Sequence, residues 1–195
     1  MKLLPFIKEN RVLVAGFTLP LLLVGLLAYA KTIPDRTIPD PQYKAAYMTQ
    51  GWSGQGQIKT DIDNNGRLTV SYKKHDTPTP ETDLPKARIF IYDPATQTNE
   101  EIEIKLTEAD GTVTVDALPE LDKLTLSSKT TAPDDYLFEP YHYRNHSLVT
   151  DIFISNRSYN TPVLTKKSRI IRLPAPSIYY SGNIEFVGWI TAEGK

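Results

Sequence analysis

Residues 101–116 read EIEIKLTEADGTVTVD, and this stretch decides the fold class. Apolar and polar side chains alternate along residues 101–106 and again along residues 112–116. A period of two places successive side chains on opposite faces, which is typical of a β-strand with one buried face. Asp110-Gly111 between the two runs is a dipeptide typical of tight hairpin turns. The stretch therefore predicts an antiparallel β-hairpin.

The same pattern recurs on both sides of this hairpin. Residues 58–62 and 68–72 alternate around Asn64-Asn65-Gly66, which predicts a second hairpin. Fifteen prolines and eleven tyrosines also favour β structure over helix. Further strands are expected at residues 87–92, 121–126, 148–154, 163–173 and 184–191. About eight strands separated by turns predict an antiparallel β-sandwich, Ig-like or transthyretin-like, with a barrel as the alternative.

A different kind of segment lies near the N-terminus. Residues 12–30 (VLVAGFTLPLLLVGLLAYA) contain no charged side chain. As a helix they are about 28 Å long, close to the roughly 30 Å hydrocarbon core of a bilayer. The segment predicts a transmembrane signal-anchor. A signal peptide cleaved after Ala30 is the alternative, because Ala28-Tyr29-Ala30 has the small-x-small form of a cleavage site.

Charge around this segment predicts its orientation. Lys2, Lys8 and Arg11 precede the apolar run, which favours residues 1–11 in the cytoplasm. The C-terminal bulk is then expected outside the cytoplasm, attached to the inner or plasma membrane, and in the periplasm of a Gram-negative cell. Residues 31–42 (KTIPDRTIPDPQ) are expected to form an extended, proline-rich stalk, followed by a β domain over residues 43–195.

A short helix is expected where the stalk meets the domain. Asp40 is a good N-cap, Pro41 suits the first helical position, and Gly51 follows the expected end. Tyr43 and Tyr47 would then share one helical face.

Composition narrows the classes of function. The formal net charge is −1, which gives no indication of a nucleic-acid partner. The absence of cysteine excludes disulfides, thiolate metal sites and C-x-x-C redox motifs. The sequence also lacks G-x-S-x-G, a P-loop and G-x-G-x-x-G. These features favour a protein that is not an enzyme and that carries no cofactor other than, at most, calcium.

Residues 61–68 (DIDNNGRL) leave two interpretations open. Asp61, Asp63 and Asn65 place oxygen donors at alternate positions and Gly66 follows, as in a calcium loop of the EF-hand type. Position 12 of that motif is Tyr72, which is not the bidentate glutamate. The other interpretation is a β-turn rich in Asn, Asp and Gly for conformational reasons.

The densest group of functional side chains is Tyr141, His142, Tyr143, Arg144 and His146. Tyrosine and arginine are enriched in protein contacts, so this run predicts a recognition surface. If the run is helical, His142 and His146 share a face and provide two zinc ligands, which would suit a metal-dependent hydrolase. Trp52 and Trp189 are the next candidates for contact, although Trp189 lies in an apolar strand and is expected in the core.

Charge is unevenly distributed along the chain. Residues 76–139 are strongly acidic, whereas residues 140–184 are basic. The basic peak is Lys166, Lys167, Arg169 and Arg172. Such a patch suits anionic headgroups or an acidic partner, or else it pairs with the acidic strands of its own domain.

Together these patterns predict a single-pass membrane protein whose β domain lies outside the cytoplasm. The expected role is a non-catalytic binding or accessory module of a cell-envelope assembly, with a protein partner. The alternatives are a metal-dependent hydrolase and a calcium-stabilised adhesion or carbohydrate-binding domain.

Overall fold

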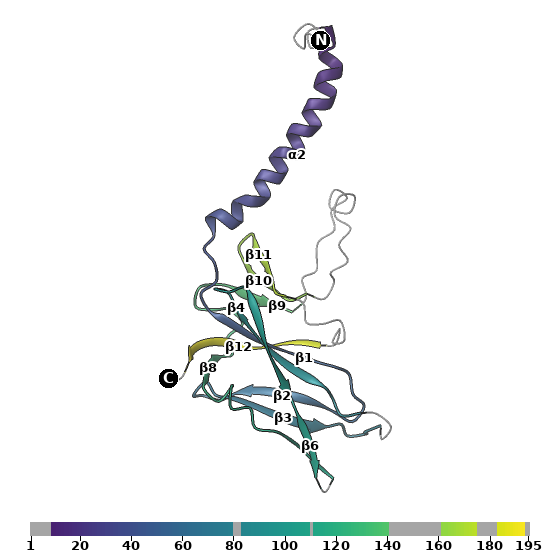
Figure 1. Cartoon of the computed structure of the whole chain (residues 1–195), viewed down its shortest axis with the longest axis vertical. Coiled ribbons are helices and arrows are strands. Elements are labelled where there is room, and N and C mark those ends of the chain that lie inside the picture. The colour runs from purple at the N-terminus through teal and green to yellow at the C-terminus, as the bar shows by residue number, and fades with distance from the viewer. Residues whose placement is uncertain (1–8, 80–82, 110, 141–160, 175–182, 194–195) are drawn as a thin grey trace. The chain divides into compact units, whose positions relative to one another are not determined.

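The computed structural model describes residues 9–79, 83–109, 111–140, 161–174 and 183–193. The chain forms two compact units, Met1–Pro39 and Asp40–Lys195. Its elements, labelled in Figure 1, are α2 (Arg11–Thr37), β1 (Lys44–Gln50), β2 (Gly56–Ile62), β3 (Leu68–Lys74), β4 (Ala87–Asp93), β5 (Thr98–Ile104), β6 (Leu106–Ala109), β7 (Thr112–Val115), β8 (Leu124–Ser127), β9 (Leu137–Glu139), β10 (Val163–Lys166), β11 (Arg169–Arg172) and β12 (Asn183–Glu193).

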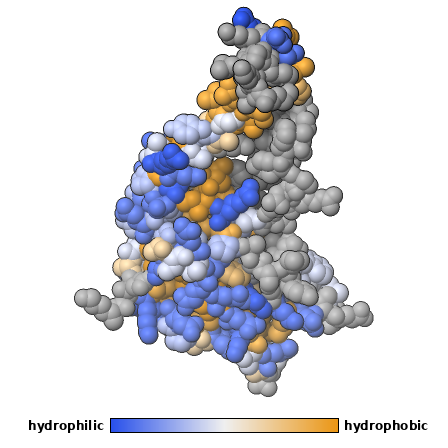
Figure 2. Space-filling model, turned by 45° about the horizontal axis from the view of Figure 1, so that its top comes forward, coloured by the Kyte–Doolittle hydropathy of each residue, from blue (hydrophilic) through white to orange (hydrophobic). Residues whose placement is uncertain are grey.

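Helix α2 is long and apolar enough to cross a membrane. Its apolar side chains, among them Val12, Phe17 and Leu21, are exposed rather than packed in a protein core, and they form the hydrophobic surface along the helix in Figure 2. The hydroxyl of Thr18 donates to the carbonyl of Val14 at 2.9 Å, which satisfies its donor inside the apolar segment. None of its 18-residue apolar window is buried inside the described protein.

The extended stalk expected from residue 31 onward is wrong over residues 31–37, because α2 continues to Thr37. Pro34 lies inside the helix, since a proline disfavours but does not forbid helix in the residue before it. Local contacts support this last turn: the Thr37 hydroxyl donates to the Ile33 carbonyl at 2.9 Å. The helix ends at Ile38, which adopts extended geometry before the next proline.

The short helix expected after Asp40 is also wrong, because residues 44–50 form strand β1. Five consecutive residues of β1, from Ala45 to Thr49, are buried. A strand covered on both faces does not alternate between apolar and polar, so its sequence carries no period of two. Two alanines also raise the helix propensity of this segment.

Strand β1 is the centre of a five-stranded antiparallel sheet with the order β5-β4-β1-β12-β8. The remaining strands form a three-stranded sheet, β11-β10-β9, and two hairpins, β2-β3 and β6-β7. Figure 1 shows the five-stranded sheet between the β9–β11 sheet on one side and the two hairpins on the other. Over the described residues no sheet closes on itself, so the barrel alternative does not hold.

One face of the five-stranded sheet carries the aliphatic core. Met48, Ile89 and Ile102 come from three neighbouring strands of the sheet and are buried together. Ile58 of β2 and Leu106 of β6 belong to the same cluster, so both hairpins cover this face. Full burial of each such side chain stabilises the fold by roughly 1.5–3 kcal/mol.

The opposite face carries a row of aromatic rings. Tyr47 lies 5.4 Å from Phe90 and 5.6 Å from Phe138, measured between ring centroids. Phe138 lies 5.0 Å from Phe186, which in turn lies 5.3 Å from Trp189. Because Phe138 belongs to β9, this row joins the β9–β11 sheet to the five-stranded sheet.

Most of the expected strands are confirmed. The predicted hairpin at residues 58–72 forms as β2-β3, and strands are present at residues 87–92 and 184–191. The hairpin predicted between residues 101–106 and 112–116 is confirmed only in part, because residues 101–104 pair with β4 and the hairpin β6-β7 starts at Leu106. The strand expected at residues 121–126 is present as β8, from Leu124. The strand expected at residues 163–173 is instead the hairpin β10-β11, with Lys167 at a positive φ of 53° in its turn. That turn contains no glycine, so the residue pattern carries little sign of it. Residues 148–154 lie outside the described residues.

Candidate functional site

Trp52 is the most exposed aromatic side chain of the described β domain, with 84% of its surface open to solvent. It lies in the loop of residues 51–55, between β1 and β2. Exposing a large indole to water is unfavourable, so an exposed tryptophan suggests that it is kept for a function. Tryptophan is also the residue type most enriched at binding hot spots. We therefore take Trp52 as the centre of the candidate site.

Hydrogen bonds hold this loop against residues 83–86. On one side of Trp52, the backbone N–H of Gly51 donates to the carbonyl of Lys86 at 2.9 Å. On the other side, the Ser53 hydroxyl donates to the carbonyl of Asp83 at 2.7 Å. Ser53 is buried, although its neighbour Trp52 is not. The loop therefore presents Trp52 from a fixed backbone, which lowers the entropy lost on binding.

A cleft of about 820 Å³ adjoins the loop. Residues 83–87 and 103–108 form its walls where β4 and β5 stop pairing, and Gln55 and Asp116 complete it. Strand β5 of the five-stranded sheet continues almost directly into β6, with only Lys105 between them, and Figure 1 shows the chain running on from the sheet into β6. The cleft and the loop that carries Trp52 are neighbours, because Asp83 and Lys86 line the cleft and also hold this loop, and Gln55 of the loop is a lining residue. We call Trp52 and this cleft the Trp52 cleft.

Charged groups line the Trp52 cleft unevenly. Its carboxylates are those of Asp83, Glu103, Glu108 and Asp116, and its ammonium groups are those of Lys86 and Lys105. All six side chains are exposed. The cleft has four acids against two bases, so its local potential is negative.

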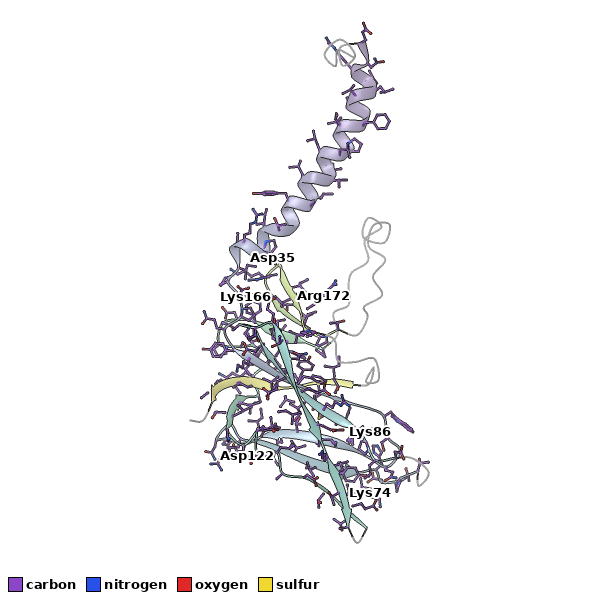
Figure 3. All side chains as sticks on the ribbon, viewed as in Figure 1. Asp35, Lys74, Lys86, Asp122, Lys166 and Arg172 are labelled. Carbon is purple, nitrogen blue, oxygen red and sulfur yellow. The ribbon has the colours of Figure 1, made fainter. Side chains whose placement is uncertain are left out.

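The basic residues at 166–172 do not form one free positive patch. Lys166 and Arg169 are mostly buried, with side chains 15% and 11% exposed. Lys166 Nζ donates to the Asp134 carbonyl at 2.5 Å, and Arg169 forms an ion pair with Asp40. Lys167 and Arg172 are exposed, so two of the four charges face solvent. Figure 3 shows Lys166 and Arg172 on the β10-β11 hairpin, away from Lys86 and the Trp52 cleft.

The ion pair between Arg169 and Asp40 also acts on two tyrosines. Burial raises the pKa of Tyr92, and the charge of Asp40 raises it further. Burial likewise raises the pKa of Tyr136, while Arg169 opposes that shift. Lys166 Nζ lies 5.5 Å from the centroid of the Tyr136 ring, within cation–π range. These contacts join β10 and β11 to Asp40 and to residues 134–136 just before β9, which gives the two buried cations a structural role.

Residues 63–67 form the turn of the β2-β3 hairpin, and Asp61 lies at the end of β2. Asp63 Oδ1 accepts hydrogen bonds from the backbone N–H groups of Asn65 and Arg67, each at 2.8 Å. Asp61 Oδ1 accepts from the backbone N–H of Ile62 at 2.9 Å. The bond from Arg67 is the main cause that lowers the pKa of Asp63. The turn accounts for these residue types, and calcium binding by Asp61, Asp63 and Asn65 stays a prediction.

The remaining sequence candidates differ in outcome. Tyr141, His142, Tyr143, Arg144 and His146 lie outside the described residues. Trp189 is fully buried in the aromatic row, as expected for a core residue. Within the described ranges, no group of three or more His, Asp or Glu side chains is placed to hold a metal ion.

Sequence reasoning named Trp52 but missed the cleft beside it. The cleft residues form no motif, and they come from four separate places in the chain, namely Gln55, residues 83–87, residues 103–108 and Asp116. The only sequence signal was the general acidity of residues 76–139. No protein family, curated protein or solved structure compared with the chain matches it.

Proposed function

We propose that this chain is a membrane-anchored, non-catalytic binding module of a cell-envelope assembly, with its β domain outside the cytoplasm. The observation that carries the proposal is the combination of one apolar spanning-length helix with a β domain that displays an exposed tryptophan on a fixed loop. We also propose that the layered antiparallel sheets belong to the sandwich class, Ig-like or transthyretin-like.

The helix supports the anchoring part of the proposal. At 27 residues, α2 is about 40 Å long, which exceeds the roughly 30 Å hydrocarbon core of a bilayer. Lys2, Lys8 and Arg11 lie at one end of it, and positive charge on short flanks favours the cytoplasmic side. The proposal therefore places residues 1–11 in the cytoplasm and Asp40–Lys195 outside.

The β domain supports the binding part. Antiparallel sheets packed on both faces hold a rigid scaffold, and loops on such scaffolds commonly carry recognition residues. Trp52 meets this description, because the residues before and after it in the loop, Gly51 and Ser53, are both hydrogen-bonded to the rest of the domain. The sequence run at residues 141–146 supplies a second candidate contact, since tyrosine and arginine are typical of interfaces.

A pair of reporter fusions after Lys195 tests the topology. Alkaline phosphatase folds to an active enzyme outside the cytoplasm, whereas β-galactosidase is active inside it. We expect phosphatase activity in the membrane fraction and none from the β-galactosidase fusion. The reverse result would refute the proposed location.

Crosslinking in intact membranes tests the binding role. We expect a discrete crosslinked partner that is lost when Trp52 is changed to alanine or when Tyr141, Tyr143 and Arg144 are replaced together by alanine. Unchanged circular dichroism of each purified variant is the control for folding. If both variants keep every crosslinked species, the residues named here do not form the contact surface.

A further inference from the structure

The Trp52 cleft has three properties that together select a class of partner: an exposed tryptophan on a loop held against its wall, a β6 edge that is unpaired among the described residues, and an excess of carboxylates. The tryptophan is Trp52, whose backbone is positioned by the hydrogen bonds of Gly51 and Ser53 to residues 83–86. The strand edge favours one feature of the ligand, and the carboxylates and the tryptophan favour another.

The strand edge favours an extended peptide. Strand β6 pairs with β7 alone among the described residues, and Leu106, Thr107 and Glu108 of β6 line the cleft. An unpaired strand edge binds an extended chain through main-chain hydrogen bonds, and a sugar does not reproduce that ladder. The cleft opens where the paired strands β4 and β5 end, at Ala87 and Ile104. It is therefore continuous with an existing sheet edge.

The carboxylates favour positive charge. Among the described residues none of the four acidic side chains of the cleft takes part in an ion pair, whereas Asp40 and Asp93 elsewhere in the domain do. Asp116 is held by the Thr107 hydroxyl, which donates to its Oδ1 at 2.7 Å. These acids therefore remain open to an incoming cation, and complementary charge speeds association and selects the partner.

The indole favours the same charge. The face of a tryptophan ring attracts the cationic groups of lysine and arginine through its quadrupole. Trp52 stands beside an acidic cleft, so ring and carboxylates favour one kind of side chain.

We propose that the Trp52 cleft binds an extended segment of a partner protein that carries lysine or arginine side chains. This assignment rests on the proposed function, because it names the chemistry of the envelope partner. The segment adds along β6, its cations meet Glu103 and Glu108, and one of them lies over the ring of Trp52.

A labelled peptide tests the proposal on the full chain in detergent micelles. The probe is a fluorescein-labelled peptide of alternating threonine and lysine (TKTKTKT), and its matched control carries glutamate in place of lysine (TETETET). Fluorescence anisotropy measures binding of both. We expect the lysine peptide alone to bind, with an affinity that falls as salt is raised, because exposed charges are screened over about 10 Å at 0.1 M salt.

Substitutions in the cleft locate the binding. Trp52→Ala is expected to weaken the lysine peptide at least about tenfold, as for a hot-spot tryptophan, and Trp52→Tyr to restore part of that loss. The pair Glu103→Gln and Glu108→Gln is expected to weaken it about fivefold, from two exposed charges. Glu100→Gln removes the same charge from β5 outside the cleft and is expected to leave affinity unchanged.

Intrinsic fluorescence gives a second readout. The chain has two tryptophans, one exposed and one fully buried, so only the emission of Trp52 is open to change on binding. We expect the lysine peptide to protect Trp52 from a soluble quencher while Trp189 emission stays constant. Constant Trp189 emission across the variants also shows that the core is intact.

Three results would overturn the proposal. One is equal affinity of the wild-type chain and Trp52→Ala for the lysine peptide. Another is binding of a neutral oligosaccharide in the cleft in place of the peptide. The third is self-association, measured by sedimentation and lost in Trp52→Ala, which would make a second copy the occupant. The reporter fusions decide the location separately, so a failed peptide assay and a failed topology are distinguishable.

Discussion

Phe138→Ala tests whether the aromatic row fastens the β9–β11 sheet to the five-stranded sheet. Phe138 is 6% exposed and has aromatic neighbours on both sides, Tyr47 at 5.6 Å and Phe186 at 5.0 Å. Truncating a buried phenylalanine removes its transfer free energy and leaves a cavity, at a cost of about 3–5 kcal/mol. Because domains of this size are stable by roughly 5–15 kcal/mol, the loss is a large share of the total.

Leu137→Ala is the matched control on the same strand. Leu137 precedes Phe138 in β9 and is 36% exposed, because successive side chains of a strand point to opposite faces. We expect it to cost about 1 kcal/mol. Urea denaturation of the full chain in detergent, followed by Trp189 fluorescence, measures both variants through a ring that neighbours Phe186.

The comparison of the two variants decides the matter. If Phe138→Ala lowers the free energy of unfolding no more than Leu137→Ala does, the aromatic row does not hold the two sheets together. An unchanged slope of free energy against urea in both variants shows that they unfold over the same surface.

Four further predictions follow from the described contacts. Tyr47→Phe is expected to lose about 0.5–1.5 kcal/mol at neutral pH, because Asn99 Nδ2 donates to the Tyr47 hydroxyl at 2.6 Å. Burial raises the pKa of Tyr47 far above its ordinary value of 10.0, so the wild type loses stability as pH rises above 10.0, while Tyr47→Phe lacks this loss in alkaline thermal melts. Asp63→Asn keeps a hydrogen-bond acceptor but removes the carboxyl group, whose pKa is lowered in the folded protein. The wild type is therefore expected to be more stable than this variant above pH 3.8, and the difference is expected to vanish as the pH falls below the lowered pKa. Unfolding measured over a series of acidic pH values tests this. Gly66→Ala is expected to cost about 1–3 kcal/mol in urea denaturation, because Gly66 has a φ of +79° and a Cβ there would lie 2.7 Å from Thr125 Cγ2. Calcium and chelator are expected to leave the melting temperature unchanged, and a rise with calcium would instead identify residues 61–65 as a metal site.

The two stretches with the clearest local pattern were predicted correctly in their type of secondary structure. Residues 101–116 form strands because alternating side chains favour one buried face wherever the strand is placed, although residues 101–104 pair with β4 and only 106–109 form the hairpin with 112–115. Residues 12–30 form a helix because an apolar run must satisfy its backbone hydrogen bonds within the segment. Both properties are local, so they are visible without neighbours.

Strand β1 shows why other elements were missed. Its residues are buried on both faces only because β4 and β12 flank it and two other layers cover it. Without those neighbours, KAAYMTQ has no period of two, and its alanines favour helix. The continuation of α2 through Pro34 was missed for a similar reason. The prediction relied on the general preference of residues before proline for extended geometry, whereas in the structure the hydroxyls of Thr32 and Thr37 donate hydrogen bonds to carbonyls of the preceding helical turn.

The same distinction between local and tertiary properties applies to the candidate site. The sequence by itself determined that the chain carries an apolar helix, alternating strands, one acidic region and two tryptophans. Only the tertiary structure decided that Trp189 is buried, that Trp52 is exposed, and that Gln55, residues 83–87 and residues 103–108 meet in one cleft. The reason is physical: periodicity and charge belong to consecutive residues, whereas burial and proximity depend on which distant segments pack together.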